Sequence, residues 1–367
     1  MRFSIAVGPT VRTDLGDTAA ACWTNHVEDA VLAEEVGFDS YYVSEHHFGY
    51  SAGHSTPMML LADIAGRTRR IRIGTSVMCA PLHCPLRLAE DLAALDIMSN
   101  GRLEIGIGVG SQIEEFRAFG VDPAERFGRT WETIDFIEKC FASPPDEIFD
   151  WKGKYYDIPG IRWVMQPVQT PVPIAWGGFG PQGVARAAKR GYHLIAPDVS
   201  GEYARVTKAD GRDPRDYLVG ISDIVSIGDS QEDALDQIVE ACTWVSNQYG
   251  LRANLDGSYP PQHVFSEDDI REASRSGNGA FGLSPSPGEK PRPFSVPIAG
   301  TVSEIRDHYL KVVRGERGLI THIRLNVRQA GAPTAGVHRT IRLFGAEILP
   351  ALREESERIW GRRPTAM

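Results

Sequence analysis

The sequence lacks a long apolar run, and a membrane-spanning helix needs about 20 such residues in succession. Its first apolar stretch, residues 3–7, is too short for the core of a signal peptide and is followed at once by Gly8-Pro9. We therefore expect neither a membrane anchor nor a secretory leader, and a cytoplasmic protein.

Basic residues are outnumbered, with 39 Lys and Arg against 48 Asp and Glu, which gives a formal net charge of -9. A protein with this balance is not expected to bind nucleic acid over a broad surface. A local basic pocket for a phosphate group remains compatible with it.

Cysteine is scarce and scattered, which argues against a disulfide framework. The five cysteines are an odd number without dense spacing, and each is expected to be a buried thiol: Cys22, Cys79, Cys84, Cys140 and Cys242. A metal site is not expected either. Four histidines could converge (His46, His47, His54 and His83), but no H-E-x-x-H spacing supports metal binding.

What the sequence does contain is a regular alternation of strand-like and helix-like segments. Eight strand-like segments are each followed by a helix or a helix-like segment; they span residues 3–7, 39–43, 71–76, 103–107, 172–175, 193–196, 218–227 and 320–325. This alternation predicts a parallel sheet, and eight units favour a closed (β/α)8 TIM barrel. No G-x-G-x-x-G opens the first strand-to-helix turn, so a Rossmann fold is disfavoured. We expect one domain over residues 1–367.

Two segments interrupt the alternation. Residues 143–170 carry Pro144-Pro145, Gly153 and Tyr155-Tyr156, which predict an inserted hairpin and loop. Residues 250–300 are rich in Gly, Pro and Ser and show no periodicity. So long a loop in a compact domain is either a floppy surface insertion or a mobile segment over the mouth of the barrel.

The catalytic groups of a barrel lie at the carboxyl ends of its strands. The second strand is followed by Glu45, His46 and His47. Adjacent side chains at a strand end point in opposite directions, so one histidine can face the mouth while the other packs. A histidine here can donate a hydrogen bond or move a proton near neutral pH, and Glu45 can tune its pKa. The alternative is that both histidines serve packing.

Glycines follow two other strands, at Gly108 and Gly110 and at Gly177, Gly178 and Gly180. They would let a flat ring or a phosphate approach the backbone closely, although glycines in a turn can also be purely conformational. Gly180 leads directly into a helix, whose free N–H groups form an anion site. Acidic residues such as Glu90 and Glu115 have the alternative of lying on solvated helix faces.

Together these residues resemble the bacterial luciferase-like family of flavin-dependent monooxygenases, and above all the luciferase α-subunit over residues 28–141. The motifs that carry the resemblance are AEEVGFDSYYVSEHHF, IGTSVMCAPLHCPLRLAEDLAALDIMSNGRLEIGIG and FRAFGVDPAERFGR. A weaker match continues through PVPIAWGGFGPQGVARAAKRG and IRLFGAEILPAL. Residues 200–300 match in architecture only.

The resemblance implies a role for each candidate residue. His46 matches the catalytic-pocket histidine, with Glu45 supporting it, and the Ser76-Val77 link falls where the family has a non-prolyl cis peptide under the flavin ring. The residues assigned to cofactor binding are Ser76, Val77, Glu90, Gly108, Gly110, Gly177, Gly178 and Gly180. Those assigned to the substrate pocket are His47, Gln112 and Glu115.

Two departures from the family affect the cofactor. The luciferase α-subunit has a reactive cysteine and a phosphate-binding arginine where this sequence has Gly108 and Val109. The loop from Gly177 to Gly180 resembles the phosphate site of relatives that use deazaflavin F420. The resemblance therefore leaves open whether the cofactor is FMN or F420.

Three functions follow from the resemblance. The first is a monooxygenase that takes reduced FMN from a partner flavin reductase and uses O2 to oxidise a small organic substrate. The second is an F420-dependent oxidoreductase that transfers a hydride, and the third is a non-catalytic flavin-binding protein. A homodimer is also implied, with the helix at residues 86–98 in its interface. The sequence does not name the substrate.

Overall fold

The computed structural model describes residues 1–8, 10–48, 54–250, 264–277 and 292–361. The strands in these residues are β1 (Arg2–Val7), β2 (Ser40–Val43), β3 (Arg72–Thr75), β4 (Met78–Cys79), β5 (Leu103–Gly108), β6 (Ile148–Lys152), β7 (Asp157–Arg162), β8 (Ile174–Trp176), β9 (His193–Leu194), β10 (Gly220–Ile227), β11 (Pro297–Gly300) and β12 (His322–Asn326). The α-helices are α1 (Ala19–Glu35), α2 (Pro57–Arg67), α3 (Pro85–Met98), α4 (Ile113–Ala118), α5 (Arg126–Ala142), α6 (Pro181–Arg190), α7 (Glu202–Ala209), α8 (Gln231–Asp236), α9 (Val239–Gly250), α10 (Glu267–Arg275), α11 (Val302–Val313), α12 (Thr334–Leu343) and α13 (Leu349–Trp360).

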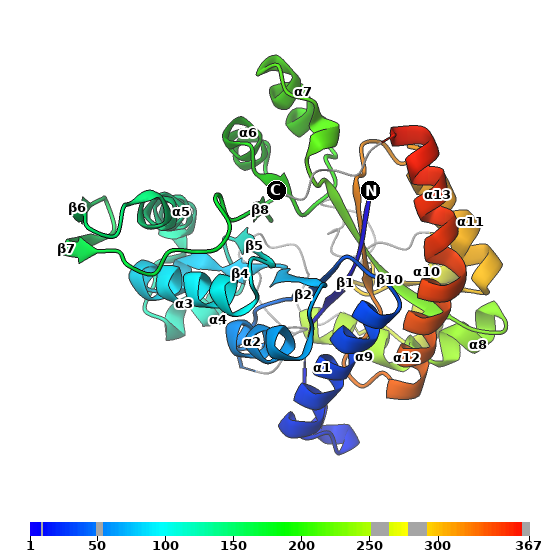
Figure 1. Ribbon diagram of the computed structural model, residues 1–367. Coiled ribbons are helices and arrows are strands. Elements are labelled where there is room, and N and C mark those ends of the chain that lie inside the picture. Colours follow the sequence, from blue (N-terminus) through cyan, green and yellow to red (C-terminus); the bar gives the residue numbers. More distant parts are fainter. Residues whose placement is uncertain (9, 49–53, 251–263, 278–291, 362–367) are drawn as a thin grey trace.

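The strands form a curled parallel sheet in the order β11-β10-β12-β1-β2-β3-β5-β8-β9, with β4 paired to β5. Helices surround this sheet, among them α1, α2, α3, α5, α6, α7, α11, α12 and α13 (Figure 1). The predicted parallel alternation is therefore confirmed. The ladder does not run continuously around a closed barrel: β9 and β10 are linked by a single parallel bridge between Leu194 and Val219.

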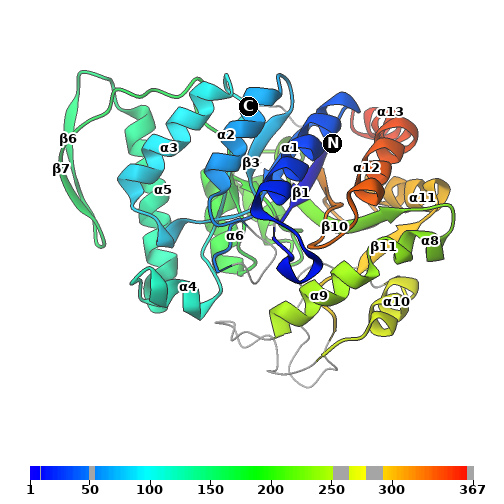
Figure 2. The same ribbon diagram turned by 90° about the horizontal axis from the view of Figure 1, so that it is seen from below.

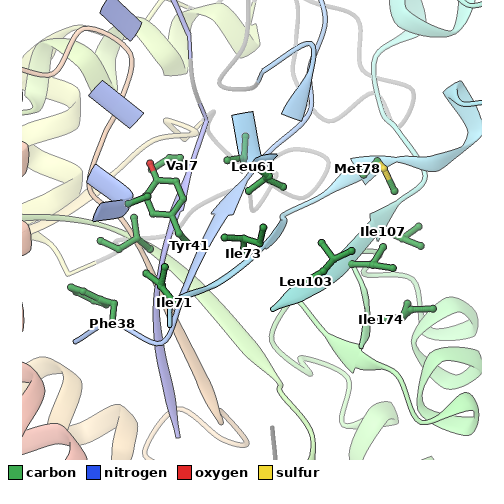
Figure 3. Close-up of a cluster of buried hydrophobic side chains, with 14 of the residues drawn as sticks. Val7, Phe38, Tyr41, Leu61, Ile71, Ile73, Met78, Leu103, Ile107 and Ile174 are labelled. Atoms are coloured by element: carbon green, nitrogen blue, oxygen red, sulfur yellow. The ribbon is translucent and has the colours of Figure 1, made fainter. Parts of the chain in front are cut away.

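The apolar core lies between the sheet and the helices around it. Val7, Tyr41, Ile73 and Leu103 point from neighbouring strands toward helix residues such as Leu61 (Figure 3). Because successive residues of a strand point to opposite faces, the other half of each strand faces the inside of the curl. Burial of the apolar residues against the helices therefore fixes which residues of each strand face the helices and which face the inside of the curl.

The inner face of the sheet is unusually polar. In a typical parallel barrel, branched apolar residues fill this space. Here Arg2, Tyr42, Glu104, His322 and Arg324 line it, and all of them are buried. All of these except Arg2 line a cavity of about 10 Å³, which is the room that one water needs. The strand pattern predicted none of this.

The hairpin predicted in residues 143–170 is confirmed. Strands β6 and β7 pair antiparallel and project from the sheet beyond α5 (Figure 2). Residues 230–248 have the pattern of one long helix but form two, because α8 ends at Asp236 and α9 begins at Val239.

The described parts of the segment 250–300 are less irregular than expected. Ser266 and Asp269 form a reciprocal capping box that starts α10, and β11 pairs with β10. Such a box satisfies two N–H groups of the first turn, so a short helix forms in a polar sequence. The remaining parts of the expected mobile loop, residues 251–263 and 278–291, lie outside the described residues.

Helices α4, α9 and α10 lie at one end of the molecule (Figure 2). This is the end at which the strands finish, because α4 directly follows β5 and Glu240 of α9 bonds Arg12 of the loop after β1. In the described part of the chain, no helix has both the length and the apolar character to span a bilayer.

Candidate active site

The loop that follows β2 is fixed by backbone hydrogen bonds at the carboxyl end of the sheet. Ser44 donates its N–H to Val7 O of β1 at 3.0 Å, and Glu45 donates to Val77 O at 3.1 Å. His54 returns to the loop and donates to Ser44 O at 2.9 Å. The Glu45-His46-His47 run is therefore held between the ends of β1 and β3, where the sequence predicted it.

Glu45 is buried and anchors two histidines. Its Oε1 accepts a hydrogen bond from His83 Nε2 at 2.8 Å, and its Oε2 accepts one from the backbone N–H of Cys79 at 2.6 Å. His47 Nε2 lies 3.3 Å from Oε1, within ion-pair range but not aligned as a hydrogen bond. Burial alone would raise the pKa of Glu45, but the interactions with His47, His83 and Cys79 outweigh burial and lower the pKa to about 2. Glu45 is therefore ionised at neutral pH.

Glu115 is the second buried carboxylate, and α4 positions it opposite Glu45. Its Oε1 lies 3.3 Å from His46 Nδ1 and accepts the backbone N–H of His47 at 2.8 Å. Its Oε2 is buried and has no hydrogen-bond partner. An unpaired buried carboxylate oxygen is costly, so this atom marks a place where a ligand or a water supplies the missing donor.

The two adjacent histidines have different surroundings. His46 pairs with Glu115, while the ring of His47 packs on Phe119 with centroids 4.6 Å apart. Burial would lower the pKa of His47, but the interaction with Glu45 prevails and raises it. The two histidine rings therefore have different partners, and which of them serves catalysis stays a prediction.

His83 is a member of this cluster whose role the sequence reasoning missed. The sequence suggests it only as a possible metal ligand, whereas in the structure it directly follows the short helical turn Ala80–Leu82 and donates to Glu45. Within the described ranges, no group of three His, Cys, Asp or Glu side chains has an arrangement that could hold a metal ion.

Ser76 and Val77 lie next to this cluster, and the peptide bond between them is cis, as the resemblance implied. Two of the predicted glycines pack against Val77. A Cβ on Gly108 would lie 2.4 Å from one methyl of Val77, and a Cβ on Gly177 would lie 2.5 Å from the other. These glycines are therefore required by the close approach of Val77, in addition to any role toward a ligand.

The loop after β8 leads into α6, and no side chain caps the start of that helix. The N-cap residue is Gly180, and a Cβ there would meet nothing within 4 Å. Beneath the loop lies Trp176, whose buried Nε1 has no partner and lies 2.8 Å from the position of a Cβ on Gly178. Uncapped N–H groups at a helix start suit an anion such as a phosphate.

The remaining predicted residues fall into two groups. Gln112 is buried directly before α4, and Gly110 has a φ of +73° and packs against Phe116. These two lie beside Glu115. Glu90 lies instead on the outer helix α3, half-exposed and 3.8 Å from Arg87. The structure does not bring it to the cluster, and its role at a cofactor site stays a prediction.

Arg324 and Asn326 were not predicted and lie under this site. Arg324 donates to Ser76 Oγ and to the carbonyl oxygen of Ile195. Asn326 ends β12 on the same face, and its buried Oδ1 has no partner. The sequence signal for these residues is that polar side chains occupy alternate positions of a strand whose other residues are apolar.

Comparison with known proteins gives a consistent picture. The sequence profile of the family described as luciferase-like monooxygenase matches residues 1–309. The uncharacterized protein y4vJ of Sinorhizobium fredii is 34% identical over 48% of this chain and 50% of its own length. The match therefore spans only half of that relative.

Two longer matches carry different names. The 4-hydroxyprotoasukamycin monooxygenase of Streptomyces nodosus subsp. asukaensis is 28% identical over 68% of this chain and 70% of its own length. An F420-dependent glucose-6-phosphate dehydrogenase of Microbacterium testaceum is 28% identical over 88% of this chain and 92% of its own length.

Solved structures share the fold. Monooxygenase RslO1 from Streptomyces bottropensis superposes with a TM-score of 0.79 and 24% identity, over 96% of this chain and 99% of that one. The oxygenating constituent of 3,6-diketocamphane monooxygenase from Pseudomonas putida, in complex with FMN, gives a TM-score of 0.73 and 19% identity, over 95% and 98%.

Proposed function

Because the chain belongs to the family of luciferase-like monooxygenases, we propose that it is the oxygenase of a two-component system. It takes reduced FMN from a separate flavin reductase and uses O2 to oxidise a small organic substrate. Its membership of the family makes it an oxidoreductase, and the choice of FMN, O2 and a reductase is the proposal.

The observation that carries the proposal is the pair of buried carboxylates with their histidines beside the cis Ser76-Val77 bond. Glu45 lies 2.8 Å from His83 Nε2 and Glu115 lies 3.3 Å from His46 Nδ1, at the carboxyl end of the sheet. Barrel enzymes place their chemistry at this end. Buried charges are retained where they serve a function or are fully paired, and Glu115 Oε2 is not paired.

The residues present fit a flavin phosphate and ring. The uncapped first turn of α6 suits the phosphate, and the unpartnered atoms Trp176 Nε1, Glu115 Oε2 and Asn326 Oδ1 offer polar groups toward bound molecules. Val77, held between Gly108 and Gly177, offers an apolar surface for the ring. When bound in its reduced form, the flavin supplies the electrons that activate O2.

His46 is the group that moves a proton in this proposal. Its Nδ1 lies 3.3 Å from Oε1 of the Glu115 carboxylate, an arrangement that would favour the tautomer with its proton on Nδ1. Glu45 orients the neighbouring His47 and His83 without touching His46. The chain thus holds one histidine for proton transfer and uses the others to keep the loop rigid.

We also propose that the sheet closes as an eight-stranded barrel and that the protein forms a homodimer. Closure is supported by the hydrogen bond from Leu194 N to Leu218 O at 2.8 Å. The dimer through α3 is supported by Ile97 and Met98, which expose 45% and 59% of their surface. The apolar residues Leu88, Leu92 and Leu95 do not support it, because they are buried within the chain. A monomeric mass at micromolar concentration would count against the dimer.

An F420-dependent oxidoreductase is the second candidate. It is favoured by the relative of that description that matches 88% of this chain, and the open start of α6 would suit F420 phosphate equally. The two candidates differ in their use of O2. A third candidate, a non-catalytic flavin-binding protein, would bind FMN and turn over nothing.

The deciding experiment titrates the purified protein anaerobically with FMN, with photoreduced FMN and with F420. The proposal predicts the tightest binding for reduced FMN. Preference for F420 together with indifference to O2 would replace it by the second candidate.

A further inference from the structure

Arg324 is buried inside the curled sheet, directly beneath the site. It lies in the middle of β12, paired in register with Ser4 of β1 and Ser222 of β10. Only 3% of its surface is exposed. Its guanidinium joins two other strand ends, because Nη1 donates to Ser76 Oγ and Nη2 donates to Ile195 O.

The charge of this guanidinium has no close counter-ion. Among the residues that the structure describes, no carboxylate oxygen lies within the 4 Å of an ion pair with Arg324, and its buried Nε has no hydrogen-bond partner. The Glu104 carboxylate on the inner face is already bonded by Arg2, Arg72 and Tyr42, and Asp223 of β10 attracts Arg324 only from beyond ion-pair distance. Arg324 is thus a buried cation without a close counter-ion.

The groups around it do not compensate this charge. Burial lowers the pKa of Arg324 to about 10, so it remains protonated at neutral pH. Burial also lowers the pKa of His193 to about 4 and the pKa of His322 well below its usual value, so both rings are neutral. Arg2 and Arg72 share the carboxylate of Glu104, whereas Arg324 has no carboxylate at ion-pair distance and only the more distant Asp223 attracts it.

Burying a cation without a counter-ion is unfavourable, because its hydration is lost. Such a cost is sustained where fixed charge in a water-poor site stabilises an anion that binds there. The atom that connects Arg324 to the site is Ser76 Oγ, next to the cis bond. An apolar residue in its place would fill the interior at lower cost.

We propose that Arg324 is a positioning residue that makes the site selective for the anionic, reduced form of its flavin. It holds Ser76 in place from below, and its charge favours an anion over a neutral ring at the carboxyl end of the sheet. This inference rests on the proposed function. It explains how an oxygenase without a resident cofactor would take reduced FMN in preference to the oxidised FMN that surrounds it.

The test compares the dissociation constants of oxidised and photoreduced FMN, measured anaerobically for the wild type and for Arg324→Met, Arg324→Gln and Arg324→Lys. The dissociation constant of oxidised FMN divided by that of reduced FMN should fall at least tenfold in Arg324→Met and Arg324→Gln. This fall corresponds to a reduction potential of bound FMN about 30 mV lower. Arg324→Lys keeps the charge and should retain most of the ratio. Arg342→Met, on the exposed face of α12, is the matched control and should leave it unchanged.

The melting temperature separates positioning from packing. If the neutral variants lose stability but keep the wild-type ratio, Arg324 serves only to link the strands by hydrogen bonds, and the inference is overturned. Arg324→Gln serves if Arg324→Met does not fold, because its amide can still bond Ser76. If the wild type binds neither form of FMN, the proposed function itself is overturned. If the wild type binds both forms and the variants keep its ratio, only the inference about Arg324 is overturned.

Discussion

His46 and Glu115 form a pair in which Nδ1 of the histidine lies 3.3 Å from Oε1 of the carboxylate. The Glu115 side chain is fully buried, while 16% of the His46 side chain is exposed. One member is therefore fixed by the fold, and the other reaches the end of the sheet where a substrate would arrive. The same carboxylate oxygen also binds the backbone of His47, so it fixes the loop together with the ring.

His46→Ala should cut turnover by about 10²–10⁴-fold, the usual contribution of a proton-transfer group. The melting temperature should change little, because His46 is partly exposed and belongs to no apolar cluster. Before a substrate is known, the rate at which O2 oxidises the bound reduced flavin gives the readout. An unchanged rate together with unchanged turnover would remove His46 from the mechanism.

His47→Ala is the internal control and should show the opposite pattern. Its ring packs on Phe119 and lies 3.3 Å from the Glu45 carboxylate. Removing it leaves a buried charge less well paired, so we expect a loss of roughly 1–3 kcal/mol in the free energy of unfolding and a smaller loss of activity. Urea unfolding and flavin oxidation on the same preparation measure both. Large loss of activity at full stability would exchange the roles of the two histidines.

Glu45 should make the free energy of unfolding fall as the pH is lowered. Its pKa is about 2 in the folded protein, below the ordinary 4.5, so its contribution is complete above pH 4.5 and is lost as pH falls toward 2. Glu45→Gln should lower the free energy of unfolding at pH 7 by roughly 1–3 kcal/mol and should flatten the acid limb. Unfolding measured between pH 7 and pH 3 tests this. Parallel curves for the two proteins would show that Glu45 is not held ionised.

Gly177→Ala should disturb Val77. The added Cβ would lie 2.5 Å from a methyl of Val77, and overpacking of this kind typically costs about 1–3 kcal/mol. Because Val77 is the surface proposed for the flavin ring, FMN affinity should fall as well. Gly180→Ala is the matched control for stability, since a Cβ there meets nothing within 4 Å and the backbone φ is -64°. Equal losses of stability in both variants would contradict the packing role of Gly177.

The first turn of α6 should distinguish FMN from riboflavin. FMN should bind at least tenfold more tightly, because only FMN carries the phosphate that the uncapped N–H groups would accept. Gln182→Glu places a negative charge in that turn and should weaken FMN binding while leaving riboflavin binding unchanged. Fluorescence titration measures all four constants. Equal affinities for FMN and riboflavin would place the phosphate elsewhere.

The strands and most of the helices could be predicted because each has an apolar periodicity or a stop signal, as with Gly37 after α1 and Gly101 after α3. The position of Glu45, His46 and His47 followed from the rule that strand ends carry the site. Their separate partners did not follow, because Glu115 and His83 reach them across more than thirty residues of chain.

The polar interior could not be predicted for a different reason. Arg324 and His322 alternate with apolar residues in β12, a pattern that usually indicates a solvated outer face. Only the register with β1 and β10 shows that this face is the inside of a curled sheet. Similarly, α10 depends on a capping box, Ser266 with Asp269, in a segment whose composition suggests no helix.

The most direct test of the proposed oxygenase activity measures how the bound reduced flavin reacts with O2. The protein is mixed anaerobically with photoreduced FMN and then with aerated buffer, while flavin absorbance and hydrogen peroxide release are recorded. If the chain is a two-component oxygenase, binding will change the rate at which the reduced flavin is oxidised relative to free reduced FMN, and His46→Ala will alter that rate again. The claim would be contradicted if the reduced flavin is oxidised at the rate of free flavin and the protein instead catalyses the reduction of F420 by an organic donor.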